Sequence, residues 1–384
     1  MNNLFTRYLV PTAALLTFAS QTVAQNSETL EQSVSSSGSS VSDVLNSARY
    51  DFGRGLTFTS RDGEATMNIS GQLQAGYNWT ETDAVATATT NSNWSMPSSR
   101  LRVGGQAMDG LTYFMQLDPQ GGGQGNGNLV DAWVGWQFNE AVHVRIGQQK
   151  MRSGLSADTS ANDTDFETAT RSLATNTFAG GRATGALFTG DAMEGKLNWH
   201  AGVMNNGTGP APAAQANSNT DMAFTVGGSF GSGGNSESWS EGDLARDGSQ
   251  SWLAGATLTQ DNAATGNFMT INAFGGMKFG NGIAAQVEYW TQDEDNASTT
   301  DSGFYVQGSY TMAQGENWQP GFVARFSSID QESLANEETT EILVGVNAYY
   351  AAHNLKTQLQ VRQVSADLAD TDTTSLDLLF TLVF

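Results

Sequence analysis

Apolar and polar residues alternate along much of the chain with a period of two. In residues 65–79, for example, Met67, Ile69 and Leu73 fall on one side and polar residues such as Gln72 fall on the other. A period of two is that of a β-strand. A water-soluble sandwich would bury the apolar side, whereas a membrane barrel turns that side to lipid and lines its lumen with the polar side.

Sixteen segments alternate in this way, and many are about nine to eleven residues long, the length that crosses a bilayer at a tilt. They are residues 65–79, 98–108, 111–118, 128–138, 141–149, 177–190, 192–205, 221–230, 251–260, 267–280, 283–292, 302–312, 319–329, 340–351, 354–364 and 375–384. Tight connections such as 109–110 and 281–282 take turns with longer polar ones such as 81–97. This pattern predicts an all-β fold, a sixteen-stranded antiparallel transmembrane β-barrel. Residues 231–248 are the exception, because they are long where a short turn is expected.

The stretch from Asp131 to Arg182 is the most informative. It opens with two alternating segments joined by Asn139 and Glu140, which predicts a tight hairpin. A long polar segment, 151–177, follows. A long loop inside a tight β pattern is usually functional. We therefore predict that this third long loop folds inward and narrows the pore.

The ends of the chain suggest export. Residues 1–24 have the features of a signal peptide, since Arg7 precedes a short apolar run and small residues end at Ala24. A membrane anchor is the alternative, but the run is too short to span a bilayer and Pro11 interrupts it. Residues 25–54 are rich in Ser, Glu and Gln and predict a flexible periplasmic arm. Residues 55–384 then form the barrel domain.

Composition limits the partners. The formal net charge of -22 argues against nucleic acid. The absence of cysteine excludes disulfides and thiolate metal sites. Nine Trp and nineteen Phe argue against a disordered acidic chain. We expect no cofactor and no enzymatic activity, because no nucleophile, base and acid accompany His143, His200 or His353. Three carboxylates at alternate positions form a weak calcium candidate, Asp163, Asp165 and Glu167.

Basic residues predict the character of the channel. Lipid-facing positions are apolar, so charged strand residues should point into the lumen, and seven basic residues cluster near the expected constriction: Arg100, Arg102, Arg145, Lys150, Arg152, Arg171 and Arg182. Rings of charged side chains select ions, and a guanidinium can pair two oxygens of one anion. The alternative is that these residues pair with Asp118, Asp131 and loop acids and shape the lumen without selecting anything.

Several blocks resemble the phosphate-selective porin O/P family: residues 98–118, residues 131–150 with Arg171-Ser-Leu, residues 303–310 and residues 322–330. The closing strand, which ends on Phe384, resembles the signal read by the outer-membrane assembly machinery. The resemblance implies a homotrimeric porin in the outer membrane of a Gram-negative bacterium, surrounded by lipid and lipopolysaccharide, with small ions and solutes in transit.

The family also implies a preference for anions such as phosphate, although this chain has only four lysines. The alternatives are a general, cation-tolerant diffusion porin, a barrel adhesin and a soluble exported β-sandwich binding protein.

Overall fold

The structure is a computed structural model that describes residues 48–84, 88–119, 129–139, 141–159, 165–205, 222–263, 266–295, 299–334 and 337–384. The predicted signal peptide and residues 25–47 therefore lie outside the described residues. The strands are β1 (Ala48–Asp51), β2 (Gly55–Thr59), β3 (Thr66–Ala84), β4 (Ala88–Met108), β5 (Leu111–Leu117), β6 (Leu129–Asn139), β7 (Val142–Lys150), β8 (Arg182–Ala192), β9 (Leu197–Asn205), β10 (Met222–Gly231), β11 (Ser251–Ala263), β12 (Gly266–Lys278), β13 (Ile283–Glu294), β14 (Thr299–Thr311), β15 (Gln319–Gln331), β16 (Glu337–Ala351), β17 (Leu355–Ala366) and β18 (Thr371–Val383).

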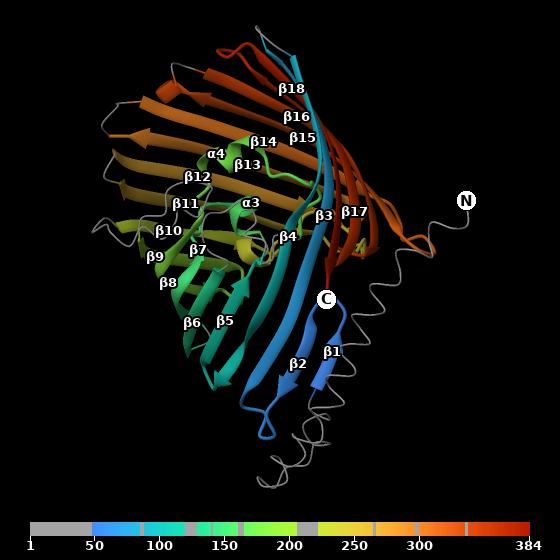
Figure 1. Cartoon of the computed structure of the whole chain (residues 1–384). Coiled ribbons are helices and arrows are strands. Elements are labelled where there is room, and N and C mark those ends of the chain that lie inside the picture. Colours follow the sequence, from blue (N-terminus) through green and yellow to red (C-terminus); the bar gives the residue numbers. More distant parts are fainter. Residues whose placement is uncertain are drawn as a thin grey trace.

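Strands β3 to β18 close into a sixteen-stranded antiparallel barrel (Figure 1). Each strand pairs with the next in sequence, and β18 pairs back with β3 from Thr371↔Ala84 to Val383↔Gln72. Closure leaves no unpaired strand edge along the wall, which is the condition for a β-sheet in a bilayer. The predicted sixteen-stranded barrel is confirmed.

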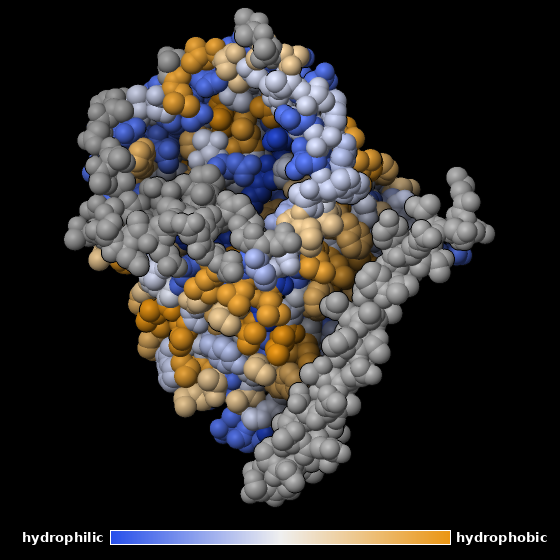
Figure 2. Space-filling model, in the orientation of Figure 1, coloured by the Kyte–Doolittle hydropathy of each residue, from blue (hydrophilic) through white to orange (hydrophobic). Residues whose placement is uncertain are grey.

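The two faces of the wall differ as the alternation predicts. On β13, Gln286 and Glu288 are buried on the inner side, whereas the outward Val287 and Tyr289 are 45% and 49% exposed. Figure 2 shows hydrophobic residues spread over the outer surface of the wall, with hydrophilic ones at its two ends. Val144 departs from this rule: it lies between Trp136 and Phe188 in the sheet and is buried, although Ile146 next along its face is exposed.

Local sequence sets the tight turns. Gly110 and Gly282 have φ of 73° and 98°, a region that side chains rarely adopt, and each follows an Asp or Asn. Such Asp-Gly and Asn-Gly pairs suit two-residue hairpins. The result is the predicted two-residue reversal between β4 and β5, whereas the link between β12 and β13 is longer than predicted and spans residues 279–282.

The N-terminal hairpin corrects part of the predicted arm. Residues 48–51, which fall within the predicted flexible segment 25–54, form β1 and pair with β2. Strand β2 in turn pairs with residues 66–69 of β3, on the edge that β18 occupies further along. Gly71 and Phe384 join these stretches through reciprocal backbone hydrogen bonds of 2.6 and 2.9 Å. Strand β2 therefore continues the wall where the C-terminal strand stops.

Other boundaries also differ from the prediction. The expected loop 81–97 is mostly strand, because β3 and β4 pair as far as Asp83↔Ala88. Residues 177–181 were expected in a strand, but β8 begins at Arg182 and residues 177–178 end a helix. The turn expected at Asp191 spans 193–196. Glu140, half of the expected 139–140 link, is outside the described residues.

The described helices are short: α3 (Leu155–Asp158), α4 (Leu173–Phe178), η1 (Ser236–Ser238) and η2 (Glu332–Leu334). Ser172 caps the start of helix α4, because its hydroxyl accepts the Thr175 N–H at 3.0 Å. Within the described part of the chain, no helix has both the length and the apolar character needed to cross a membrane.

Candidate functional site

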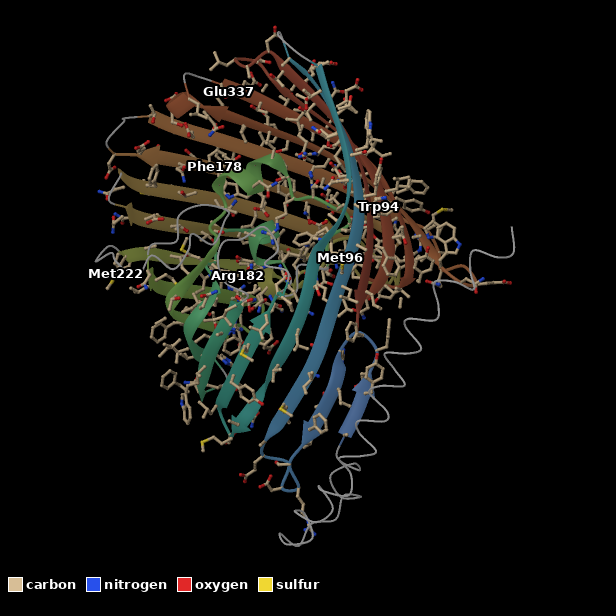
Figure 3. All side chains as sticks on the ribbon, in the orientation of Figure 1. Trp94, Met96, Phe178, Arg182, Met222 and Glu337 are labelled. Atoms are coloured by element: carbon tan, nitrogen blue, oxygen red, sulfur yellow. The ribbon has the colours of Figure 1, made fainter. Side chains whose placement is uncertain are left out.

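The connection between β7 and β8 lies against the inner face of the opposite wall. Helices α3 and α4 lie within the outline of the barrel (Figure 1), and Phe178 of α4 lies in front of the far strands (Figure 3). Three backbone N–H groups of this connection donate to side chains on β13, β15 and β17: Ser156 to Glu288, Ala174 to Ser327 at 3.1 Å, and Ala169 to Gln360 at 2.8 Å. The described parts of the connection, residues 151–159 and 165–181, are called the β7–β8 insert below.

Helix α4 packs by apolar contact as well. Ala174 and Phe178 form a buried cluster with Trp290, Tyr305 and Ile329 from the wall. Burial of such large side chains stabilises the arrangement by roughly 1.5–3 kcal/mol each. The insert is therefore held by a small apolar core as well as by polar contacts.

A glycine lets the insert approach the wall closely. A Cβ added at Gly154 would lie 2.8 Å from Glu288 Oε2 and 2.9 Å from Asn272 Oδ1. Both distances are shorter than real Cβ contacts. A Cβ here would have to displace the Glu288 carboxylate or the Asn272 amide, and the φ of 156° at Gly154 also favours glycine.

A second connection also lies against the inner wall. Residues 232–250 link β10 to β11 at the end of the barrel that carries the short turns, and they are called the β10–β11 insert below. Its Trp239 is almost fully buried and its Nε1 lies 3.3 Å from Gln286 Oε1. The Nζ of Lys278 lies 4.9 Å from the Trp239 ring. This insert overlaps residues 231–248, the segment that is long where the alternation of long and short connections predicts a short turn.

The two inserts meet at Glu241. Its carboxylate accepts hydrogen bonds from Gln286 Nε2 at 2.7 Å, from Gln307 Nε2 at 2.8 Å and from the Glu167 N–H at 2.8 Å. Its own N–H donates to the Asp165 carbonyl at 2.8 Å. A single carboxylate thus joins both inserts to the wall.

Charge and burial shift the pKa values of two carboxyl groups of the inserts in opposite directions. Burial raises the pKa of Glu167 to about 8, and the nearby Glu241 carboxylate adds to the shift. Burial also acts on Glu237, but the charges of Arg152 and Arg145 outweigh it and hold the pKa of Glu237 below its ordinary range. At neutral pH Glu237 is therefore an anion, whereas Glu167 is mostly a neutral acid.

Six of the seven predicted basic residues line two cavities. Arg100, Lys150, Arg171 and Arg182 line one of about 390 Å³, together with Lys356. Arg145 and Arg152 line another of about 200 Å³. Arg102 lines neither: it is buried and hydrogen-bonds Gln72 and, at 2.7 Å, Gln116 Oε1. The structure thus divides the predicted cluster into a larger and a smaller cationic cavity.

Four of these basic residues form ion pairs. The nearest charged atoms of Arg100 and Asp118 lie 3.6 Å apart, and those of Arg182 and Asp131 lie 2.9 Å apart. Arg145 and Arg152 share Glu237. The pairing with Asp118, Asp131 and acids of the connections that the sequence left open is therefore present for these four.

The remaining two make other contacts. Lys150 Nζ donates to the Ala157 carbonyl at 3.1 Å, and the Arg171 guanidinium lies 5.2 Å from the centre of the Phe166 ring. The larger cavity is thus lined by three guanidinium groups and two lysine side chains.

Sequence reasoning missed Glu237, which joins Arg145 and Arg152. The unexpected length of residues 231–248 was the available signal, but length alone does not say where a connection folds. It also missed the buried pair of Arg325 and Glu341 on β15 and β16, 2.8 Å apart. Pairing across neighbouring strands depends on register, which only the assembled sheet fixes.

One residue of the calcium candidate lies outside the described residues, so the set of three stays a prediction. That residue is Asp163, and the Asp165 carbonyl accepts the Glu241 N–H. Among the residues that the structure describes, no group of three His, Asp or Glu side chains is placed to hold a metal ion. Two of the histidines, His143 and His200, line the smaller cavity.

Solved structures with a similar fold are porins and channels of bacterial outer membranes. The chain is similar to the outer membrane channel DcaP of Acinetobacter baumannii, at 11% identity and a TM-score of 0.56 over 86% of this chain and 100% of that one. It is also similar to an anion-selective porin from Comamonas acidovorans, at 12% identity and a TM-score of 0.53 over 84% of this chain and 100% of that one. The structure of OmpT of Vibrio cholerae is similar at 11% identity and a TM-score of 0.53, over 84% of this chain and 99% of that one. No curated protein matches the chain.

The fold and its charged lumen thus define an outer-membrane porin, a channel for passive diffusion. The family model of phosphate-selective porins O and P matches residues 67–379. The chain belongs to this family, and the resemblance of its sequence blocks to the family is confirmed.

Proposed function

We propose that the protein carries small anions across the outer membrane, and that the larger cationic cavity is the selective part of its path. One observation carries the proposal: Arg100, Lys150, Arg171, Arg182 and Lys356 converge on about 390 Å³. Two of these residues, Arg100 and Arg182, form ion pairs with Asp118 and Asp131.

The chemistry of the five side chains suits oxyanions. A guanidinium presents a planar fork that pairs two oxygens of a phosphate or carboxylate, and a lysine adds a compact positive charge. Charged rings in a narrow channel select by sign more than by identity. We therefore propose a preference for anions such as phosphate, with the β7–β8 insert as the constriction. The anion selectivity described for the Comamonas porin agrees with this proposal.

The surroundings of the channel follow from its class. We propose that residues 1–24 are a cleaved signal peptide, that the chain assembles as a homotrimer, and that its apolar belt contacts lipid and lipopolysaccharide. No catalytic role is proposed. Gel migration before and after heating, with light scattering of the detergent-solubilised protein, tests the trimer; a particle of one chain would contradict it.

A second candidate is a general diffusion porin that tolerates cations. It is favoured by the net charge of -22 and by the ion pairs of Arg100 and Arg182, which reduce the field of the cavity. Loop acids at the mouths would also attract cations at low salt.

Reversal potentials in planar bilayers, under a gradient of potassium chloride and then potassium phosphate, separate the two candidates. We expect a reversal potential of the sign given by anion permeation. A reversal potential of the sign given by cation permeation would contradict the anion preference. The absence of any ohmic conductance would contradict the proposal that the protein is a channel.

A further inference from the structure

We propose that Arg145 and Arg152 form a second anion site, specific for a carboxylate, and that Glu237 of the β10–β11 insert occupies it as a ligand built into the chain. Arg145 Nη1 and Nη2 donate to Glu237 Oε1 and Oε2 at 2.9 and 3.1 Å. Arg152 donates to Oε2 as well. Two guanidiniums thus hold one carboxylate, and the Arg145 guanidinium contacts both oxygens of that carboxylate.

The site is formed by strand β7 of the wall together with the start of the β7–β8 insert. Arg145 lies on β7 with its guanidinium 4.8 Å from the centre of the Trp133 ring on β6. Arg152 is buried and lies 3.8 Å from Asp158 Oδ2. A planar fork fixed by an aromatic ring and a second cation is the arrangement that recognises a carboxylate, because little order must be created on binding.

The bound carboxylate belongs to a separate element. Glu237 lies in η1, and its neighbour Ser236 donates to Asp158 Oδ2 at 2.9 Å. The four charges of Arg145, Arg152, Asp158 and Glu237 sum to zero. Withdrawal of Glu237 would leave one uncompensated positive charge within hydrogen-bonding reach of an entering solute.

The neighbouring cavity has room for a small ligand. About 200 Å³ adjoin the pair, lined by Arg145, Arg152, Glu237 and His200. His200 Nε2 is buried and has no hydrogen-bond partner in the structure. A carboxylate that replaced Glu237 would therefore meet both guanidiniums and an unused polar atom.

A tethered ligand competes at a high local concentration, in the millimolar range for a short link. Solute carboxylates therefore bind weakly to the natural protein, and removal of Glu237 reveals the site. In this way the β10–β11 insert sets which anions pause in the channel. The transport consequence rests on the proposed anion channel, but the binding itself does not.

Calorimetric titration of acetate into the full-length, detergent-solubilised protein tests the site. The Glu237→Ala variant should bind acetate at least about tenfold more tightly than the natural protein, because its tethered competitor is gone. Glu316→Ala removes an exposed acid from a turn at the same end of the barrel and should bind as the natural protein does. Heat-modifiable migration on a gel checks that each variant is folded.

Equal acetate affinity in the folded Glu237→Ala variant and the natural protein would overturn the proposal. So would tighter binding of inorganic phosphate or chloride than of acetate, since the class would then be wrong. The double variant Glu237→Ala, Arg145→Ala should lose the increase in acetate affinity that Glu237→Ala alone produces. If acetate binds as expected but no variant conducts in bilayers, the channel proposal fails and this site stands.

Discussion

The Glu167 backbone N–H donates to Glu241 Oε2 at 2.8 Å, so a residue of the β7–β8 insert hydrogen-bonds a residue of the β10–β11 insert inside the barrel. The two residues are 74 positions apart in the chain. Each insert begins at a different end of the wall. The two inserts therefore contact each other as well as the wall, and we expect the position of one to depend on the other.

Glu241 should control how tightly the inserts hold together. Glu241→Ala leaves the amides of Gln286 and Gln307 and the Glu167 N–H without this acceptor. Each buried donor that loses its partner costs about 1–3 kcal/mol. We expect a larger single-channel conductance and a lower urea midpoint in liposomes. Glu316→Ala is the control, and an unchanged conductance in Glu241→Ala would contradict the role given to this contact.

The same contact should weaken as the pH rises. The folded-state pKa of Glu167 is raised to about 8 from 4.5, so between these values the folded protein binds a proton that the unfolded chain has lost. Stability therefore falls as the pH rises through this window, and the contribution of Glu167 is constant above it. Urea unfolding from pH 5 to 9 measures the slope. Glu167→Gln should flatten it, and an equal slope in that variant would assign the effect to other groups.

The larger cavity should lose anion preference with its basic residues. Replacing Lys150 and Arg171 by Ala removes two of the five positive charges, and we expect the chloride to potassium permeability ratio to fall about two- to threefold, since the field of the charged ring decides the sign of the ion. Bilayer reversal potentials measure the ratio. Arg54→Ala, outside the barrel, is the control. An unchanged ratio would mean that the two residues only position the insert.

Arg145 is expected to affect selectivity less than Arg171, although both changed to Ala should shift the channel toward cations. The reason is that Glu237 already compensates Arg145, whereas Arg171 lies beside an aromatic ring. Removal of a charge that Glu237 compensates should change the field less than removal of one of the five cations that line the larger cavity. The same recordings on the two single variants measure the order. A greater effect at Arg145 would contradict the view that Glu237 masks it.

The pair of Arg325 and Glu341 should be the most sensitive point of the inner wall. Both side chains are almost fully buried, and Arg325 also donates to the Thr170 carbonyl of the β7–β8 insert at 2.9 Å. Arg325→Met leaves Glu341 buried with only Arg362, 3.3 Å away, as a cation. We expect a loss of about 3–5 kcal/mol in urea unfolding. The double variant Arg325→Met, Glu341→Leu should recover much of the loss, and a loss as large as in the single variant would argue against a charge effect.

The sequence by itself determined the wall. Its period-two alternation located all sixteen strands and gave their outer faces, because lipid on one side and water on the other act on every second residue independently of distant parts of the chain. It failed at strand ends such as residues 81–97, since polar residues in a strand that extends past the bilayer resemble a loop. It also named six of the seven basic residues that line the two cavities.

Only the tertiary structure decided what fills the lumen. The partners of Arg145, Arg152 and Glu241 come from connections that carry no periodic pattern, and their contacts depend on how the closed barrel brings β7, β10 and β13 round a common interior. An ion pair between residues 92 positions apart, such as Arg145 and Glu237, leaves no local trace in the chain. The wall is a local consequence of solvent and lipid, whereas the site is a consequence of closure.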